Sequence, residues 1–287
     1  MMKYVPCHMR VFPMQLGVHY VDHFAFHLHW LKYLIERLGA QLAVELWQQA
    51  LREEEDELLT KILSDGWTEA QKENRIDVAE RVNALASEIF SAPIEGVSAS
   101  EAQRIISASP PFSQIVRHFL DLNVEKNIST YDALHLFYHS IARLAETLIE
   151  QHGKRGELIA YDAMLYANVV NQTERLPAAD YLTGKRARFE KGYEQPDIFT
   201  AGLERNIIRG TEKELTWQVL ECEWARYFRE HHPRVGTIVA CSTDHAEYGS
   251  YNEKIRLQLT STIMEGDPLC SFRLYAIDSG DDDTGDD

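Results

Sequence analysis

The chain has 287 residues, of which 45% are hydrophobic and 26% charged, and its formal net charge at pH 7 is −16. This length suits one large domain or two small ones. The negative charge argues against nucleic acid and membrane surfaces as partners, because phosphate groups bind to concentrated positive charge. No run of eighteen apolar residues predicts a transmembrane helix.

The first residues and the cysteine content bear on the cellular compartment that we expect for the protein. The first residues lack the charged-then-apolar layout of a secretory signal, and the chain holds only four cysteines. We therefore expect reduced thiols in a cytoplasmic protein. The acidic segment 279–287 has the composition of a disordered tail. A small-molecule substrate is the expected partner, and homo-oligomer formation stays open.

The elements predicted in the first two thirds of the chain are mainly helices. Apolar spacing, caps and breakers predict helices over 18–38, 40–63, 68–91, a short stretch after a cap at Ser98, 112–122, 129–152 and 156–174. Residues 184–196 are polar and turn-rich, and we predict that they connect two layers of the fold.

The pattern changes after about residue 205. Alternating apolar and polar residues predict a strand over 215–219, helices over 223–231 and 235–248, a long strand over 255–264, a reversal at 265–268 and a returning strand over 269–277. The predicted fold class is α+β, with a large helical N-terminal part followed by an antiparallel sheet capped by helices. We expect residues 1–200 to be mainly helical and 205–278 to pack with them as one catalytic unit.

Three cysteines lie in patterned local sequence. Cys222 lies three residues after the first predicted strand, Cys241 begins Cys-Ser-Thr-Asp, and Cys270 follows Thr-Ile-Met-Glu-Gly-Asp-Pro-Leu. Over residues 215–275 this arrangement resembles the bacterial L-2-amino-thiazoline-4-carboxylate hydrolase family. The resemblance implies a hydrolase of cyclic C–N bonds that opens a small sulfur- and nitrogen-containing ring at its C=N carbon, without metal or other cofactor.

The candidate catalytic residues gather around Cys241. Asp244 lies three residues later and His245 four, so a helix would place all three on nearly the same face. A thiolate attacks amidine-like carbon well, a carboxylate can protonate the departing ring atom, and histidine can act as base. The resemblance adds Cys270 to this set. The competing interpretation is that free cysteines are often buried and simply pack.

Substrate-binding candidates lie on the predicted hairpin and beside it. Arg273 and Arg256 are suited to a substrate carboxylate, because guanidinium binds carboxylate with two parallel hydrogen bonds. A surface salt bridge is an equally good explanation for Arg273. Thr262, at the start of the shared hairpin segment, and Cys222 complete the expected binding residues.

Two histidine stripes suggest a different class of function. His19, His23 and His27 recur at spacings of four, and His135 and His139 repeat that spacing on a later predicted helix. Such pairs on facing helices would hold a transition metal, which gives a helical-bundle metalloenzyme as the alternative. No Glu-x-x-His motif completes the set, and histidines among aromatic residues more often pack.

Two further alternatives concern the cysteines and the C-terminal segment. Three thiolates and a histidine would suit zinc, although no Cys-x-x-Cys pair is present. The C-terminal segment is also similar to ligand-sensing domains of the 4-vinyl-reductase type. That similarity suggests a non-catalytic small-molecule-binding module.

Overall fold

The computed structural model describes most of the chain. The described residues are 6–51, 57–64, 68–69, 78–91, 94, 96–108, 113, 124–170, 177–191, 198–242, 244, 248, 252 and 254–277. The tail predicted for 279–287, the candidate His245 and nearly all of the helix predicted for 112–122 lie outside them. No described helix is both long and apolar enough to cross a membrane.

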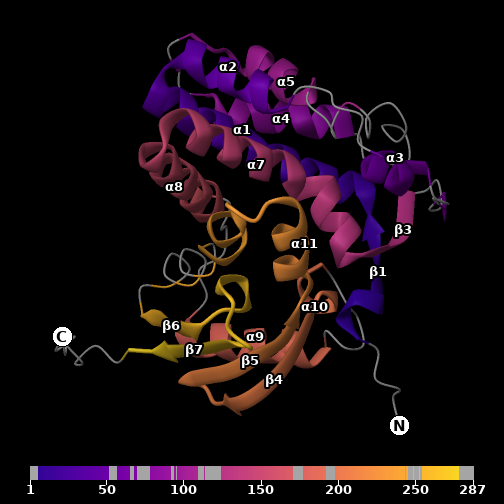
Figure 1. Cartoon of the computed structure of the whole chain (residues 1–287), viewed down its shortest axis with the longest axis vertical. Coiled ribbons are helices and arrows are strands. Elements are labelled where there is room, and N and C mark those ends of the chain that lie inside the picture. Colours follow the sequence, from indigo (N-terminus) through magenta and orange to yellow (C-terminus); the bar gives the residue numbers. More distant parts are fainter. Residues whose placement is uncertain are drawn as a thin grey trace.

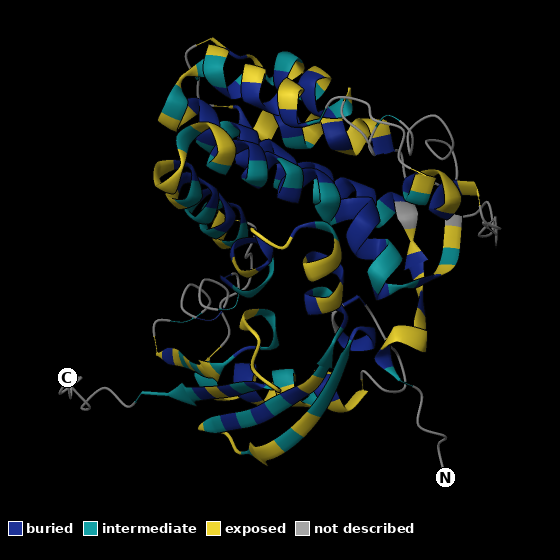
Figure 2. Ribbon diagram, in the orientation of Figure 1, coloured by how far each residue is buried: buried dark blue, intermediate teal, exposed yellow. Residues whose placement is uncertain are grey.

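Helices form the upper layer of the molecule (Figure 1). They are α1 (Leu16–Leu38), α2 (Ala40–Ala50), α3 (Glu57–Ser64), α4 (Val78–Ile89), α5 (Ala99–Ser107), α7 (Thr130–His152) and α8 (Lys154–Val170). A small antiparallel sheet lies at one end of this layer, in the order β1 (Val11–Gln15), β3 (Val124–Ser129) and β2 (Thr68–Glu69). Figure 2 shows that the buried residues concentrate along α1 and α7.

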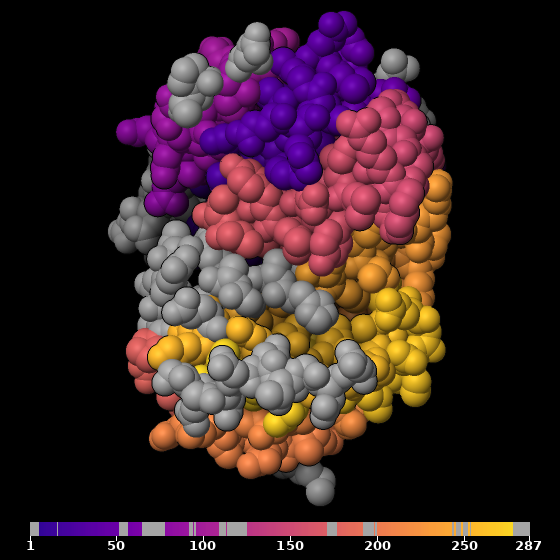
Figure 3. Space-filling model, turned by 90° about the vertical axis from the view of Figure 1, so that its left-hand side faces the viewer, coloured from indigo at the N-terminus to yellow at the C-terminus, as the bar shows by residue number. Residues whose placement is uncertain are grey.

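A four-stranded antiparallel sheet forms the lower layer (Figure 1). In the space-filling view of Figure 3 the orange and yellow C-terminal residues accordingly lie below the indigo N-terminal ones. Its order is β4 (Leu203–Gly210), β5 (Glu214–Cys222), β7 (Cys270–Ala276) and β6 (Ile255–Ser261). The other helices around it are η1 (Cys7–Met9), α9 (Ala178–Lys191), α10 (Ile198–Ala201), α11 (Glu223–His231), η3 (Thr237–Cys241) and η4 (Ile263–Glu265). The predicted α+β class, with helices first and an antiparallel sheet after them, is confirmed.

Helix α7 is the central scaffold, and its ends follow from local chemistry. The Ser129 hydroxyl oxygen accepts the Asp132 amide hydrogen at 3.1 Å, which caps the first turn. The helix stops at Gly153, where φ is +56°, a conformation that glycine adopts without a steric penalty. The helix predicted over 129–152 is therefore confirmed.

The buried apolar residues form two clusters, one in each layer. In the lower cluster Trp217 stacks on Phe272 with ring centroids 4.7 Å apart, and α9 contributes Leu182. The upper cluster includes Tyr227 of α11 as well as the N-terminal helices. The clusters therefore cross the division predicted near residue 200, and that division stays a prediction.

Several predicted elements were wrong in extent or kind. The start of the helix predicted over 68–91 was wrong, because Thr68 and Glu69 pair with β3; its described helical part is α4. Most of the connection predicted over 184–196 is helix α9, in which a few apolar side chains on one face cover the sheet. The strand over 255–264 ends at Ser261, since the next residue caps η4. Strands β1, β3 and β4 were not predicted.

Candidate active site

Three of the four cysteines converge where the two layers meet. Cys222 is the last residue of β5 and the N-cap of α11, Cys241 ends η3, and Cys270 begins β7. Asp244 follows η3 and acts electrostatically on all three thiols, which also act on one another. We call these four residues the thiol cluster. Cys241, Asp244 and Cys270, which we expected at one site, are thus within electrostatic reach of one another, and their roles there stay a prediction.

The electrostatics of the thiol cluster favour neutral thiols. Burial raises the pKa of Cys222 to about 12, against the hydrogen bond that its sulfur accepts from the Ala225 amide at 3.3 Å. Burial also raises the pKa of Cys241, and the Asp244 carboxylate raises it further. The pKa of Cys270 rises for the same two reasons. All three sulfurs therefore carry their protons at neutral pH.

The turn between β6 and β7 is built around Thr262 and holds Cys270. The Thr262 hydroxyl accepts the Glu265 amide hydrogen at 3.3 Å, and its own amide donates to the Asp267 carboxylate at 2.9 Å. The next amide, that of Ile263, donates to the sulfur of Cys270 at 3.2 Å. Thr262 is buried and occupied by these contacts, so its first role is to shape the turn.

Both arginines chosen from the sequence lie on the other face of the sheet. Cys270 and Arg273 are an odd number of residues apart on β7, so their side chains point to opposite faces. Arg273 donates to the Glu214 carboxylate at 3.1 Å. Arg256 is opposite Tyr275 in the register and shares the outer face with Arg273. Neither arginine is placed beside the thiol cluster.

A third arginine, which the sequence interpretation missed, is connected to the thiol cluster. Arg229 of α11 is exposed and donates a hydrogen bond to the carbonyl of Ile263, whose amide binds Cys270. Within the described part of the chain Arg229 has no acidic partner. The sequence did contain a signal for Arg229: it lies seven residues after Cys222, a spacing that puts the two residues on one side of a helix.

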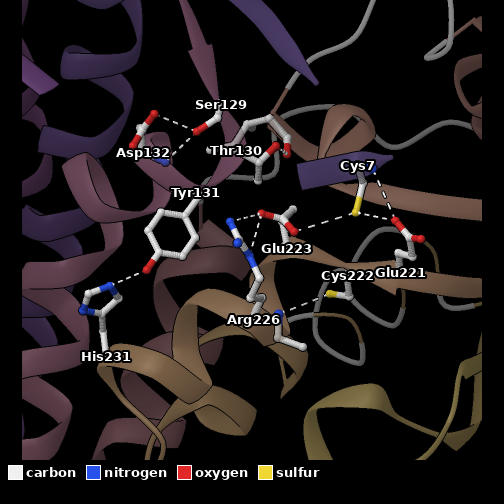
Figure 4. Close-up of polar contacts among 12 residues, drawn as sticks. Cys7, Ser129, Thr130, Tyr131, Asp132, Glu221, Cys222, Glu223, Arg226 and His231 are labelled. Carbon is white, nitrogen blue, oxygen red and sulfur yellow. Dashed lines mark hydrogen bonds and ion pairs between the residues drawn. The ribbon is translucent and has the colours of Figure 1, made fainter. Parts of the chain in front are cut away.

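The fourth cysteine belongs to a separate contact at the start of α11 (Figure 4). The Cys7 thiol donates to the Glu221 carboxylate at 3.2 Å, and Glu223 lies 3.8 Å from the same sulfur. Burial and the bond to Glu221 raise the pKa of Cys7 to about 12. Glu223 is itself buried and forms an ion pair with Arg226 at 2.8 Å. Cys7 thus anchors η1 to the sheet.

The two histidine stripes do not meet. His23 stacks on Phe137 at 4.4 Å between ring centroids, and His27 hydrogen-bonds the Ser140 hydroxyl at 2.8 Å. His135 and His139 instead contact side chains of α11 and its C-cap. No three metal-binding side chains among the described residues are grouped as ligands. The arrangement that would support the metalloenzyme alternative is therefore not formed by these two stripes.

Gly236 lets η3, η4 and α11 approach one another at the thiol cluster. An added β-carbon would lie 2.6 Å from the Met264 sulfur and 2.9 Å from the β-carbon of Phe228. We expect Gly236→Ala to lower the free energy of unfolding by about 1–3 kcal/mol, because the packed neighbours must move. Urea unfolding would measure it, with Gly184→Ala as the control, since no atom lies within 4 Å of the added carbon there. Equal stability of Gly236→Ala and the wild type would contradict this packing.

Comparison with known proteins connects this geometry to a family. Residues 134–274, just under half of the chain, match the family described as L-2-amino-thiazoline-4-carboxylic acid hydrolase. Searches of curated proteins and of solved structures found no match. The matched segment runs from α7 to β7 and contains every residue of the thiol cluster. The resemblance seen over 215–275 is confirmed: from α7 to β7, this chain is similar to the L-2-amino-thiazoline-4-carboxylic acid hydrolase family.

Proposed function

We propose that this protein is a cytoplasmic hydrolase that opens a thiazoline-like ring bearing a carboxylate. The observation that carries the proposal is the thiol cluster, which lies inside the segment that matches the family. The family match supports a hydrolase acting on a thiazoline carboxylate, and the cluster offers a place where a carboxylate base and three neutral thiols converge.

Asp244 is the proposed general base. It takes a proton from water, whose oxygen bonds to the C=N carbon between the two ring heteroatoms, and a tetrahedral intermediate forms. The C=N electron pair passes to the ring nitrogen, which takes the hydroxyl proton of the intermediate. As the carbonyl forms, the bond from that carbon to the ring sulfur breaks, and the sulfur leaves with the proton that Asp244 had received. The product is an N-carbamoyl thiol. His245 is a second candidate for carrying this proton.

The neutral thiols give the site its shape in this proposal. Cys241, Cys270 and Cys222 line the reacting ring as weak hydrogen-bond donors, because burial and the neighbouring carboxylate disfavour a thiolate. Incubation with 2-aminothiazoline-4-carboxylate and mass spectrometry for N-carbamoylcysteine is the direct test. Turnover of neither this compound nor a bulkier analogue would refute the proposed function.

Arg229 is the proposed partner of the substrate carboxylate, in place of Arg256 and Arg273. We expect Arg229→Gln to raise KM for 2-aminothiazoline-4-carboxylate at least about tenfold, because a charge-assisted pair is lost. The KM for 2-aminothiazoline, which has no carboxylate, should change little. Steady-state kinetics on the two compounds measures the difference.

The matched control for this prediction is Arg273→Gln. Arg273 is also an exposed arginine, but it belongs to β7 and lies on the face of the sheet opposite Cys270. Its replacement should leave both KM values within about twofold, as surface ion pairs contribute little. An equal rise in KM for both compounds in Arg229→Gln would show that Arg229 does not bind the carboxylate.

A further inference from the structure

The outer side of α8 concentrates exposed apolar side chains. Leu158 is 56% exposed, Val169 43% and Val170 40%. Of the seven large apolar side chains that are exposed among the described residues, three therefore lie on this one 17-residue helix. Leu165, between them, is partly exposed. Large apolar residues that gather at one exposed place commonly mark a surface that binds another protein.

The exposed residues share one face of α8. Leu158, Leu165 and Val169 are spaced by seven and four residues, and Tyr161 and Asp162 lie between them. We call these five residues the α8 stripe. The opposite face packs on α1 and α7 through buried residues, which are Ala160, Ala163, Met164 and Ala167. A helix that is apolar on both faces is typical of one that is covered on both sides.

The position of α8 in the fold agrees with the exposure of the stripe. In Figure 1 α8 is the helix at the outer left of the helical layer. Figure 3 faces that side of the molecule, and rose-coloured residues from this part of the chain lie on its surface. A partner can therefore approach the outer face of α8 directly.

The charge of α8 differs from that of the whole protein. The chain carries a net charge of −16, whereas the charged residues of α8 are Lys154, Arg155, Glu157 and Asp162, so its two positive and two negative charges cancel. Lys154 and Glu157 already form an ion pair at 2.5 Å. Like charges repel when two copies of an acidic protein meet. The neutral, apolar α8 stripe is a place where two copies can meet with little repulsion.

Asp162 is held in position at the middle of the stripe. Its carboxylate accepts the Tyr33 hydroxyl hydrogen at 3.2 Å and lies 3.9 Å from the Arg37 guanidinium, both on α1. The Asp162 side chain is 44% exposed, and a carboxylate offers about four acceptor positions, so it can accept a further hydrogen bond. The adjacent Tyr161 carries a phenol donor, but neighbouring residues on a helix do not face each other. Tyr161 is therefore suited to the Asp162 of a second copy.

The α8 stripe is complementary to itself under a two-fold rotation. An antiparallel pair of α8 helices, centred between residues 161 and 162, places Leu158 opposite the partner's Leu165 and Tyr161 opposite the partner's Asp162. The two-fold axis repeats each contact, so four contacts form from two. At each end the aliphatic part of Lys154 lies against the partner's Val169. No like charges face each other in this register.

We propose that two copies of this chain associate through the α8 stripe as an antiparallel helix pair. The leucine contacts remove apolar side chains from water, and the two hydrogen bonds from Tyr161 to Asp162 fix the register. A 17-residue helix is about 26 Å long, so its contact with one other helix buries less than the roughly 800 Å² per partner of a standard interface. The dimer is therefore a reversible one.

Sedimentation velocity of the full-length protein tests the dimer. Concentrations up to about 100 μM should show a dimer that dissociates on dilution. Leu158→Lys should raise the dissociation constant at least about tenfold, because it places a charge against the partner's Leu165. Ile208→Lys is the matched control: Ile208 is also 56% exposed but belongs to β4, and its replacement should leave the dimer unchanged. Circular dichroism checks that each variant is folded.

A mixing experiment tests the antiparallel register. At a concentration where half of the wild type is dimeric, Leu158→Lys and Leu165→Glu should each be mainly monomeric. An equimolar mixture of the two variants should dimerise, because their opposite charges face each other at one end of the pair and two leucines meet at the other. A parallel pair would not bring positions 158 and 165 together.

Three results would overturn the proposal. The first is a folded wild type that stays monomeric at about 100 μM, which would leave the α8 stripe to a different protein. The second is a dissociation constant that is equal in Leu158→Lys and the wild type. The third is a mixture of Leu158→Lys and Leu165→Glu that is as monomeric as its two components.

Discussion

Replacement of Asp244 by Asn is expected to lower kcat/KM for ring opening by about 10²–10⁴, the usual contribution of a general base. Asn keeps the size of the side chain but cannot accept the proton from water. Cys241→Ala should cost less than about tenfold, because a thiol that keeps its proton is a poor nucleophile and a general-base mechanism does not need it. Steady-state kinetics with the carboxylated thiazoline measures both.

The contrast between these two variants decides the mechanism. Cys270→Ala is the control for thiol removal as such, since burial and the Asp244 carboxylate raise the pKa of Cys270 as well. Iodoacetamide should inactivate the wild type only slowly at neutral pH, and faster as the pH rises toward the pKa of the thiols. A loss in Cys241→Ala as large as that in Asp244→Asn would instead establish covalent catalysis by Cys241.

Local sequence signals predicted the scaffold of the thiol cluster well. The helix over 223–231 matches α11 at both ends, and the Gly-Asp-Pro reversal gives the β6–β7 hairpin. Strand alternation also contained the information that separates Cys270 from Arg273, because the two differ by three residues. The carboxylate role was assigned to Arg273 from the chemistry of its guanidinium group, whereas the alternation places it on the opposite face.

The contacts of His135 and His139 were beyond prediction from local pattern. Their stripe is visible in the sequence, but their partners Tyr227 and His232 lie 92 and 93 residues later, on α11 and its C-cap. Only the packing of α7 against α11 brings His232 to His139, and no periodicity encodes which helices pack together. The strands β1 and β3 were missed for a similar reason: they are short, and their pairing partners lie far apart in the sequence.

The lowered pKa values of three histidines on α1 lead us to expect a loss of stability in acid. Burial lowers the pKa of His27 to about 4, although the bond from its Nδ1 to the His23 carbonyl opposes the shift. Burial also lowers the pKa of His29 to about 4, and that of His23 well below the ordinary range. In the unfolded chain these imidazoles titrate near their ordinary value of about 6.5.

Between about pH 4 and about pH 6.5, His27 binds fewer protons in the folded state than in the unfolded state. The free energy of unfolding therefore rises with pH in this range. The contribution of His27 is fully present above about pH 6.5 and is lost as the pH falls to about 4, a change of about 3 kcal/mol. We expect His27→Gln to remove that part of the decline, since glutamine can bond the same neighbours but does not titrate. Urea unfolding across this pH range measures the slope.

The control for this slope is His8→Gln, because His8 is exposed and lies on η1, outside α1. Its pH dependence should match that of the wild type. His27→Gln should be less stable at neutral pH if the bond to Ser140 is weakened. Its plot of unfolding free energy against pH should nevertheless be flatter in acid. The two effects can be separated because only the second depends on pH. A slope in His27→Gln as steep as that of the wild type would mean that His27 gains its proton as readily in the fold as in the open chain, which its burial between α1 and α7 argues against.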